Sequence, residues 1–337
     1  MWMLPTRLLT RKNYLPYPSN MEVLQYSIRK IMAGIPLVLG VTLISFLLIV
    51  YFGPDQTYEL LGKNPTAEEI AEVRAQLGYD QPFVTRYLQY LREIVTLDFG
   101  NSQSTDEKVS SILARTIPVS LLLSLPGFVL GNLLGVILAL LAAYYRGQWL
   151  DKFIMGFAAV GMSISFLIAI IGFQILLSSS DGLDLFPVRG WDTSTPWQYL
   201  RYVTVPTLAT VFVALGYNTR FYRAVIVEEM TRDHVRTARA FGIPPMQLFY
   251  KNILKNCMIP IVTRVVFSIP LIVISGSLLL ESFFGIPGIG KVSYDAIITG
   301  DQPVLKAVVA LTAVLFVVAQ LLTDICYRLV DPRVSLQ

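Results

Sequence analysis

The residues that most often carry out chemistry are sparse in this sequence. It contains one histidine, His234, and two cysteines, Cys257 and Cys326, with no CxxC pair and no cluster of Cys and His. A zinc site or a disulfide framework requires such clusters. A histidine-based catalytic dyad would have only His234 to draw on. The sequence therefore argues against a metal site or a catalytic centre built by this chain alone, and no catalytic, cofactor-binding or metal-binding residue is expected.

Three glycines around Pro287 could suggest a phosphate-binding loop, namely Gly285, Gly288 and Gly290. A phosphate loop of the GxxxxGK[ST] type needs a Ser or Thr after its lysine and a helix that begins there. Val292 follows Lys291 here. A turn beside a short helix explains these glycines better, and this chain has no nucleotide loop of its own.

The most informative segment is a short amphipathic helix followed by a sharp break. Asp233 is a plausible N-cap, Gly242 suits the left-handed position that ends a helix, and Pro244-Pro245 prevents its continuation. Val235, Ala238 and Phe241 share one face, while Arg232, Arg236 and Arg239 lie largely on another. Such a helix either lies on lipid or docks into a groove of another protein. The narrow face of small residues favours docking.

The elements that position this segment are membrane-spanning helices. Of 337 residues, 54% are hydrophobic and 15% charged, and the mean hydropathy is +0.58. A spanning helix needs roughly 20 apolar residues. Long uncharged runs satisfy or approach this length at six places, which excludes a soluble core and predicts six spans: residues 31–54, 116–145, 153–180, 202–219, 265–280 (beginning near Cys257) and 307–323.

Basic residues near the ends of the spans predict the orientation. Arginines and lysines precede the first span, follow the second and sixth, and gather between the fourth and fifth. With six spans all of these places lie on one side, so both termini are expected in the cytoplasm. Residues 1–20 lack the apolar stretch of a signal peptide and look like an extension of the chain.

The outer segment 54–115 is expected to contain two helices. Thr66 with Glu69 forms a capping-box pattern before a helix over residues 67–77, and apolar residues recur at helical spacing over 83–96. This segment is either a small cap packed on the spans or a landing surface for a soluble partner.

A few polar or small residues within the spans also carry expectations. Gly127, Gly131 and Gly135 recur every four residues, which predicts close helix packing. Arg220 and Arg223 are expected to reach the membrane surface and anchor span four. Arg264 lies deeper and either extends to the surface or has a partner. Glu281 and Asp324, at opposite ends of spans five and six, are expected to be polar packing groups.

Several motifs together resemble one family. Asp233-His-Val-Arg-Thr-Ala-Arg-Ala-Phe-Gly, with Asn256 and Pro260 downstream, is similar to the cytoplasmic coupling motif of ABC importer permeases of the dipeptide/oligopeptide branch. The similarity covers about residues 21–333, and Phe241 and Lys251 depart from it where the family usually has Lys and His. Further agreements are Leu77-Gly-Tyr-Asp-Gln-Pro, Asp98-Phe-Gly-Asn-Ser, Arg146-Gly-Gln-Trp-Leu-Asp, Glu281-Ser-Phe-Phe-Gly-Ile-Pro-Gly-Ile-Gly-Lys, Asp301-Gln-Pro-Val, Asp324 with Tyr327, and Asp331-Pro-Arg.

The resemblance implies an all-α polytopic membrane protein with the type I importer permease fold and six transmembrane helices, non-catalytic and located in the inner membrane. The implied parts are a cytoplasmic tail (1–30), a first span (31–53), an extracytoplasmic helical segment (54–115), a permease core (116–330) that includes a cytoplasmic coupling segment (228–256), and a C-terminal tail (331–337). The residues implied to couple to an ATPase are Asp233, Val235, Arg236, Thr237, Ala238, Arg239, Ala240, Phe241 and Gly242.

The resemblance also implies partners. These are a second, similar permease, two ATPase subunits that bind ATP, an extracytoplasmic substrate-binding protein and the lipid membrane, without nucleic acid. The chain itself is implied to hold no cofactor.

Other functions remain open from the sequence. Within the same branch, the substrate could be a nickel chelate, glutathione or a glycoside in place of a di- or oligopeptide. A secondary transporter or channel would be supported by acids in mid-membrane or by inverted repeats, and neither is visible. A membrane-embedded enzyme would need a constellation of reactive residues within the spans.

Overall fold

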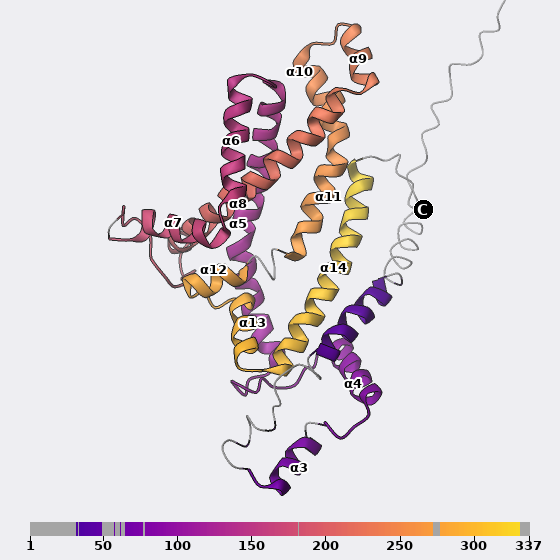
Figure 1. The fold of residues 1–337 in the computed structure, drawn as a ribbon, viewed down its shortest axis with the longest axis vertical. Coiled ribbons are helices and arrows are strands. Elements are labelled where there is room, and N and C mark those ends of the chain that lie inside the picture. The colour runs from indigo at the N-terminus through magenta and orange to yellow at the C-terminus, as the bar shows by residue number, and fades with distance from the viewer. Residues whose placement is uncertain are drawn as a thin grey trace, which may run out of the picture.

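The computed structural model describes residues 32, 34–48, 57, 61, 65–76, 78–180, 182–271 and 277–330. Within them the chain is built from helices, arranged as an elongated molecule (Figure 1). One end carries α9 and α10, and the opposite end carries α3 and α4. The helices are α3 (Ala67–Gln76), α4 (Phe83–Thr96), α5 (Val109–Tyr144), α6 (Trp149–Ser163), α7 (Phe166–Ser178), α8 (Pro196–Met230), α9 (Asp233–Ala240), α10 (Pro245–Leu248), the π-helix η1 (Phe249–Leu254), α11 (Lys255–Leu271), α12 (Ser277–Phe284), α13 (Ile289–Ile298) and α14 (Gln302–Val330).

Four helices are long and apolar enough to cross a membrane: Val109–Tyr144, Pro196–Met230, Pro245–Ile269 and Gln302–Thr323. They overlap the predicted second, fourth, fifth and sixth spans. The prediction of the fifth span is wrong at its end, because α11 is described to Leu271 and residues 277–280 of the predicted run belong to α12. The pair α6 and α7 adds a fifth span if the two are counted together. Of the predicted first span, the structure describes the shorter apolar helix Gly34–Leu48. The expectation of an all-helical membrane protein is confirmed.

The third predicted span is not one straight helix. α6 and α7 meet at an angle of 103°, and α7 leaves the bundle sideways in Figure 1. Ile164 at the break has extended backbone angles, φ −83° and ψ 129°. The hydroxyl of Ser163 donates to the carbonyl of Ala159 at 2.8 Å, which offers a competing bond at the helix end. Polar and β-branched residues at 163–165 favour such an interruption.

The fifth span begins earlier than its apolar run. The helix runs continuously from Pro245 through the π-helical turn Phe249–Leu254 into α11. Single π-helical turns recur at functional positions because they shift the register of the residues that follow. The connecting arm and the span are therefore one continuous helix.

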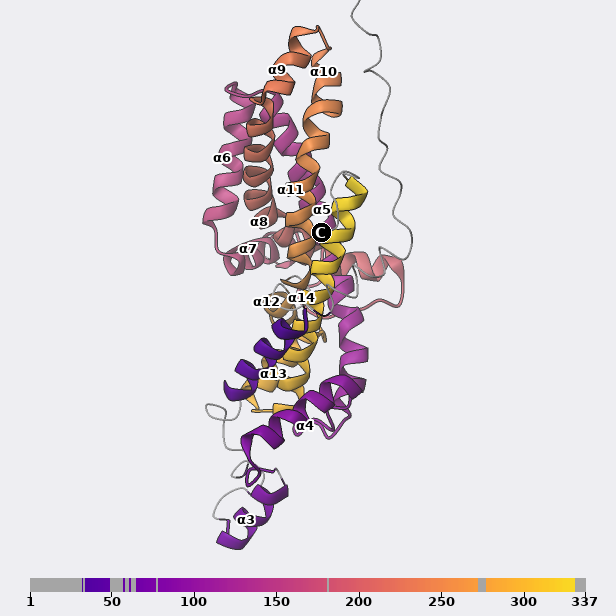
Figure 2. The same cartoon turned by 90° about the vertical axis from the view of Figure 1, so that its right-hand side faces the viewer.

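The glycines of α5 allow α8 to approach closely, as predicted. A Cβ atom added at Gly127, Gly131 or Gly135 would lie 2.9 Å from the side chain of Thr210, Ala214 or Asn218, respectively. These three partners also recur every four residues on α8. Gly161 of α6 and Gly216 of α8 make a second close contact, through backbone atoms. α5, α6 and α8 thus run side by side (Figure 2).

The opposite end is a small helical cap, as one of the two readings proposed. Thr66 and Glu69 exchange capping bonds, with Thr66 N donating to Glu69 Oε2 at 2.8 Å and Glu69 N to Thr66 Oγ1 at 3.3 Å. This confirms the predicted capping box before α3. Tyr90 of α4 is buried and donates to the carbonyl of Lys306 in α14 at 2.9 Å. α4 is thereby joined to the last span.

The Glu281 motif is explained by a buried capping arrangement. Glu281 is fully buried, and its carboxylate accepts from the hydroxyl of Ser120 and from the backbone N–H of Lys291 at 2.9 Å. The carboxylate therefore lies at the N-terminus of α13, where negative charge is favourable. A Cβ atom at Gly288 would approach the carboxylate carbon to 2.3 Å, so this position requires glycine. Gly288 thus serves packing, whereas Gly285 adopts the left-handed backbone, φ +69°, of the turn after α12.

Asp301 fixes the start of α14. It is 1% exposed, and its carboxylate accepts from the Ser102 hydroxyl, the Ser104 hydroxyl at 2.8 Å, and the backbone N–H of Val304 at 3.4 Å. Burial opposes the ionised form, but these donors outweigh it and hold the pKa of the Asp301 carboxyl below its usual 3.8. The motif that begins at Asp98 and the motif that begins at Asp301 are therefore joined directly, by the hydrogen bond from Ser102 to Asp301.

We expect this contact to be lost in acid. Because the pKa of Asp301 is lower in the folded protein, its stabilisation is present above about pH 3.8 and disappears as the pH falls through the folded value. Asp301→Asn should therefore be less stable than wild type at neutral pH, and the difference should vanish in acid. Thermal unfolding in detergent between about pH 3 and 7 measures this. Asp295→Asn, an exposed change on α13, should leave the pH profile unaltered.

Candidate functional site

The predicted coupling helix is present, with one correction at its start. α9 begins at Asp233, and Arg232 occupies the N-cap without a side-chain capping bond. Asp233 is therefore the first helical residue, where its charge favours the helix dipole. The end is as predicted. Gly242 has φ +74° and donates its N–H to the carbonyl of Arg239 at 3.0 Å, and α10 begins at Pro245.

The predicted site residues divide into an inner and an outer set. Val235 is fully buried and Ala238 is 8% exposed, and both pack in a core with Tyr222, Ile226 and Ile253. The small apolar face therefore holds α9 against the two arms, and it is not the surface that was expected to dock. The exposed set comprises Asp233, Arg236, Thr237, Arg239, Ala240, Phe241 and Gly242.

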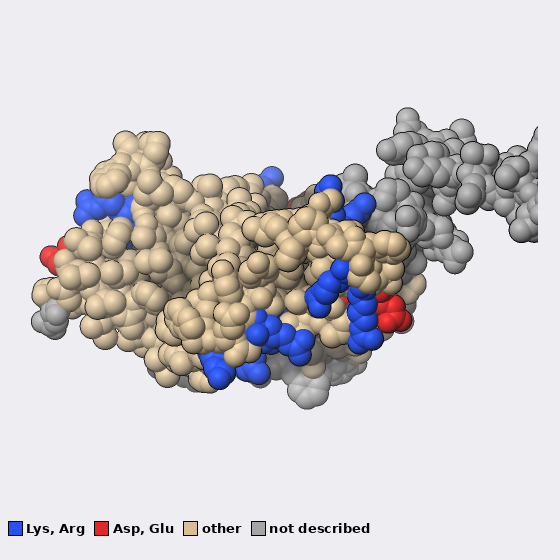
Figure 3. All heavy atoms as spheres, turned by 90° about the horizontal axis from the view of Figure 1, so that it is seen from above, with Lys and Arg blue, Asp and Glu red and all other residues tan. Residues whose placement is uncertain are grey.

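The outer face of this end is basic and carries exposed apolar side chains. Seen from above, Lys and Arg side chains predominate over Asp and Glu (Figure 3). Phe241 is 83% exposed, and Met246 and Tyr250 are exposed as well. Exposed apolar groups within a charged surface are typical of protein interaction sites.

Glu229 joins the three parts of the segment. It is 6% exposed and lies in the last turn of α8. One oxygen, Oε2, lies 2.9 Å from Arg232 Nε, and the other, Oε1, accepts from Asn256 Nδ2 at 2.8 Å. His234 Nε2 is 3.3 Å from Oε1. A single carboxylate thus links the end of α8, the start of α9 and the start of α11. The sequence analysis did not single out Glu229, although Asn256 belonged to the motif.

A buried ion pair ties α6 to α8 near the same end. Arg223 donates from Nε to Asp151 Oδ1 at 2.7 Å and from Nη2 to Oδ2 at 2.6 Å. The Asp151 side chain is 6% exposed and that of Arg223 is 22% exposed. The bidentate pair gives Arg223 a partner on α6, and its expected reach to the membrane surface stays a prediction. Asp151 belongs to the Arg146–Asp151 motif, which thereby acquires a structural role.

Arg264 was expected either to extend to the membrane surface or to have a partner, and it has partners within the bundle. Its Nε donates to Asn218 Oδ1 at 3.2 Å, and its guanidinium lies 4.7 Å from the ring centroid of Phe221. Asn218 in turn contacts Asn132, which accepts from Tyr222 at 2.6 Å. Asn132 and Asn218 also line a cavity of about 180 Å³ between α5, α8 and α11. These amides, missed from the sequence, make a polar patch at mid-height.

Comparison with known proteins agrees with this architecture. A family profile described as binding-protein-dependent transport system inner membrane component matches residues 131–336, and its N-terminal companion matches residues 23–124. A peptide transport system permease protein of Brucella abortus is 31% identical over 312 residues, covering 91% of this chain and 98% of that protein. The dipeptide transport system permease protein DppB of Bacillus subtilis is 30% identical, covering 93% and 98%.

Two further matches bear on substrate and fold. The glutathione transport system permease protein GsiC of Salmonella paratyphi A is 30% identical, covering 93% of this chain and 99% of that protein. The inward-facing MetNI methionine ABC transporter gives a TM-score of 0.54 at 18% identity, covering 65% of this chain and 96% of the solved chain. The fold, the span pattern and these matches agree, and the chain belongs to the family of binding-protein-dependent transport system inner membrane components.

Proposed function

We propose that this chain is the permease subunit of an ATP-driven importer of di- or oligopeptides. In this proposal the α9 end faces the cytoplasm, and the exposed residues of α9 dock into a groove of an ATPase subunit that binds ATP. A second, similar permease completes the pathway, and an extracytoplasmic binding protein delivers the substrate. The chain contributes half of the pathway and no catalytic residue.

The observation that carries the proposal is the two-sided construction of α9. Its inner face is fixed by Val235 and Ala238 and by the Glu229 contacts, while its outer face is exposed. The two arms that hold it are long continuous helices, α8 and the rod from Pro245 to Ile269. A rigid element joined to two spans transmits a displacement in an ATPase to the membrane. ATP can shift the conformation only through such a differential contact.

The distribution of charge supports the proposed orientation. Basic residues gather at the α9 end, and cytoplasmic segments beside spans are enriched in Lys and Arg (Figure 3). The α3 and α4 end then faces outward, where a binding protein would arrive.

The names of the similar proteins support the substrate class. The Brucella and Bacillus relatives are named for peptides and dipeptides, and the Salmonella relative for glutathione. Glutathione is itself a short peptide with one γ-linkage, so the two readings share a size class. Competition between a dipeptide and glutathione for uptake into proteoliposomes holding the complete transporter distinguishes them.

We expect Ala240→Glu to abolish ATPase association without harming the fold. Ala240 is exposed, so a larger side chain meets solvent in the isolated chain and a steric and electrostatic conflict in a docked complex. Co-purification of the ATPase subunits of its own system in mild detergent measures the effect. Gln247→Glu, an equally acidic change at an exposed position on α10, should retain the ATPase.

Two results would contradict the proposal. Ala240→Glu could retain the ATPase and ATP-dependent uptake at wild-type levels. Alternatively, the wild-type chain could purify alone and transport without ATP, which would make a secondary transporter or channel the better description.

A further inference from the structure

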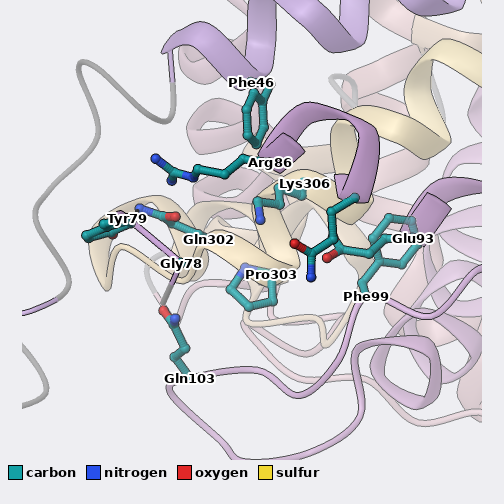
Figure 4. Close-up of a pocket in the computed structure, with 11 residues that line it drawn as sticks. Phe46, Gly78, Tyr79, Arg86, Glu93, Phe99, Gln103, Gln302, Pro303 and Lys306 are labelled. Atoms are coloured by element: carbon teal, nitrogen blue, oxygen red, sulfur yellow. Dashed lines mark hydrogen bonds between the residues drawn. The ribbon is translucent and has the colours of Figure 1, made fainter. Parts of the chain in front are cut away.

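A charged recess lies at the end of the molecule opposite α9. It has a volume of about 250 Å³ and is enclosed by α4, the start of α14, the helix Gly34–Leu48 and the turn at residues 78–79. Arg86 and Glu93 of α4 and Lys306 of α14 all line the recess. Figure 4 shows the Arg86 side chain extending toward Tyr79, with Lys306 between it and Glu93. The recess belongs to no part of the coupling segment and to no contact described above.

The two cations of the recess lie against aromatic rings. The Lys306 Nζ lies 5.8 Å from the ring centroids of both Phe46 and Tyr90. The Arg86 guanidinium lies 4.9 Å from the centroid of Tyr79 and 5.9 Å from that of Phe46. Cation–π contacts orient a cation but leave its N–H donors unused. The hydrogen-bonding capacity of both groups therefore remains available.

Ion pairing within the recess is incomplete. In the described part of the chain, Arg86, Lys306 and Glu93 make no N–O contact within 4.0 Å of an opposite charge. Burial raises the pKa of the Glu93 carboxyl, and the Lys306 ammonium only partly opposes this. Partly buried charges are stabilised by an opposite charge. A ligand carboxylate would stabilise Arg86 and Lys306, and a ligand ammonium would stabilise Glu93.

We propose that this recess binds an amino-acid-sized zwitterion, namely a free amino acid. The carboxylate of the ligand lies between Arg86 and Lys306, and its ammonium lies against Glu93. A guanidinium matches a carboxylate with two parallel hydrogen bonds, which makes Arg86 the main determinant. The volume is at the lower limit for small-molecule sites and fits one residue, not an extended peptide.

The recess lies between the cap helix α4 and the last span α14. Lys306 is in the first turns of α14, whereas Arg86 and Glu93 belong to the cap helix α4. A ligand bound between them links the cap to the last span. That this face meets the external solution rests on the proposed function, but binding itself does not depend on ATPase coupling.

Binding of L-alanine to the full chain in detergent, measured by isothermal titration calorimetry, tests the site. We expect saturable binding at one ligand per chain, weakened about tenfold to a hundredfold in Arg86→Gln, since a hydrogen bond to a charged group is lost. Arg92→Gln, an exposed arginine on the same helix, is the matched control and should bind as wild type does.

Blocked ligands separate recognition from a structural effect. Arg86→Gln should weaken L-alanine much more than L-alaninamide, which has no carboxylate. Glu93→Gln should weaken L-alanine much more than N-acetyl-L-alanine, which has no ammonium. Absence of saturable binding to wild type, or binding equal in Arg86→Gln and wild type, overturns the proposal. A third result would also overturn it. If amino acids do not bind but Arg86→Gln weakens docking of the binding protein, the recess takes an acidic side chain of that protein and not a free amino acid.

ATPase co-purification tests α9, at the other end of the molecule. It can therefore fail while the recess binds the amino acid, or succeed while the recess does not. The two proposals therefore stand or fall separately.

Discussion

Replacing Arg223 with methionine is expected to lower the free energy of unfolding by about 3–5 kcal/mol. The substitution leaves the Asp151 carboxylate buried at 6% exposure, with the backbone N–H of Gly147 at 2.9 Å and the more distant charge of Arg146 to compensate it. Removing one partner of a buried pair costs more than the pair contributes, because the remaining charge is stranded away from water. Thermal unfolding of the purified chain in detergent should show a fall of several degrees.

The pair also predicts an asymmetry between its members. Asp151→Asn should cost less, because the Arg223 side chain is 22% exposed and its long stem lets the guanidinium turn toward water. Combining Asp151→Asn with Arg223→Met should recover much of the loss, since no stranded charge remains. Lys152→Met, at the exposed neighbouring position, is the control. Equal losses for Arg223→Met and Lys152→Met would show that the ion pair contributes little.

The positions of the helices could be predicted because their signals are local. The capping pattern at Thr66, the apolar spacing over Phe83–Thr96 and the Gly242 stop each involve residues a few positions apart. Length and hydropathy similarly locate the spans, since a run of apolar residues needs no distant partner to favour lipid. The four-residue spacing of the α5 glycines predicted packing correctly, although not which helix they would face.

The contacts that position the site could not be predicted in this way. Asp151 and Arg223 lie 72 positions apart in the sequence, and Glu229 and Asn256 lie 27 apart, and no periodic signal pairs them. The bend at Ile164 depends on how α6 is held against α8, which the apolar composition of the run conceals.

The face of α9 was misread for a related reason. A stripe of small apolar residues fits a partner's groove and the chain's own core equally well, and only the arrangement of the arms decides between them. The sequence thus located the helix α9 but could not say which of its faces was exposed.

Replacing Glu229 with glutamine is expected to uncouple transport from ATP hydrolysis. The carboxylate accepts from Arg232 and Asn256 and lies 3.3 Å from His234 Nε2. A glutamine amide would present its own N–H donors to one of these two donors in place of an acceptor. The core contacts of Val235 and Ala238 would still hold α9 in place, but its orientation relative to the two arms would no longer be fixed. We expect ATPase association to persist because the exposed face is unchanged.

The effect should appear in the ratio of two rates in proteoliposomes. Substrate uptake should fall by about tenfold or more, within the usual range of coupling free energies, while ATP hydrolysis continues. Glu228→Gln is a close control, since its neighbouring carboxylate is exposed and makes only a 3.8 Å contact with Arg232. If uptake by Glu229→Gln stayed within about twofold of wild type, the carboxylate would not be what fixes the orientation of α9 relative to its two arms.

A second substitution approaches the same contact from the opposite helix. Asn256→Asp would place a carboxylate beside Glu229, where like charges repel at the distance now spanned by a 2.8 Å hydrogen bond. It should therefore uncouple transport as Glu229→Gln does, although it adds a charge where the other removes one. Agreement between these two changes, made on α11 and on α8, would assign the coupling to the hydrogen-bonded link itself and not to the charge of the segment.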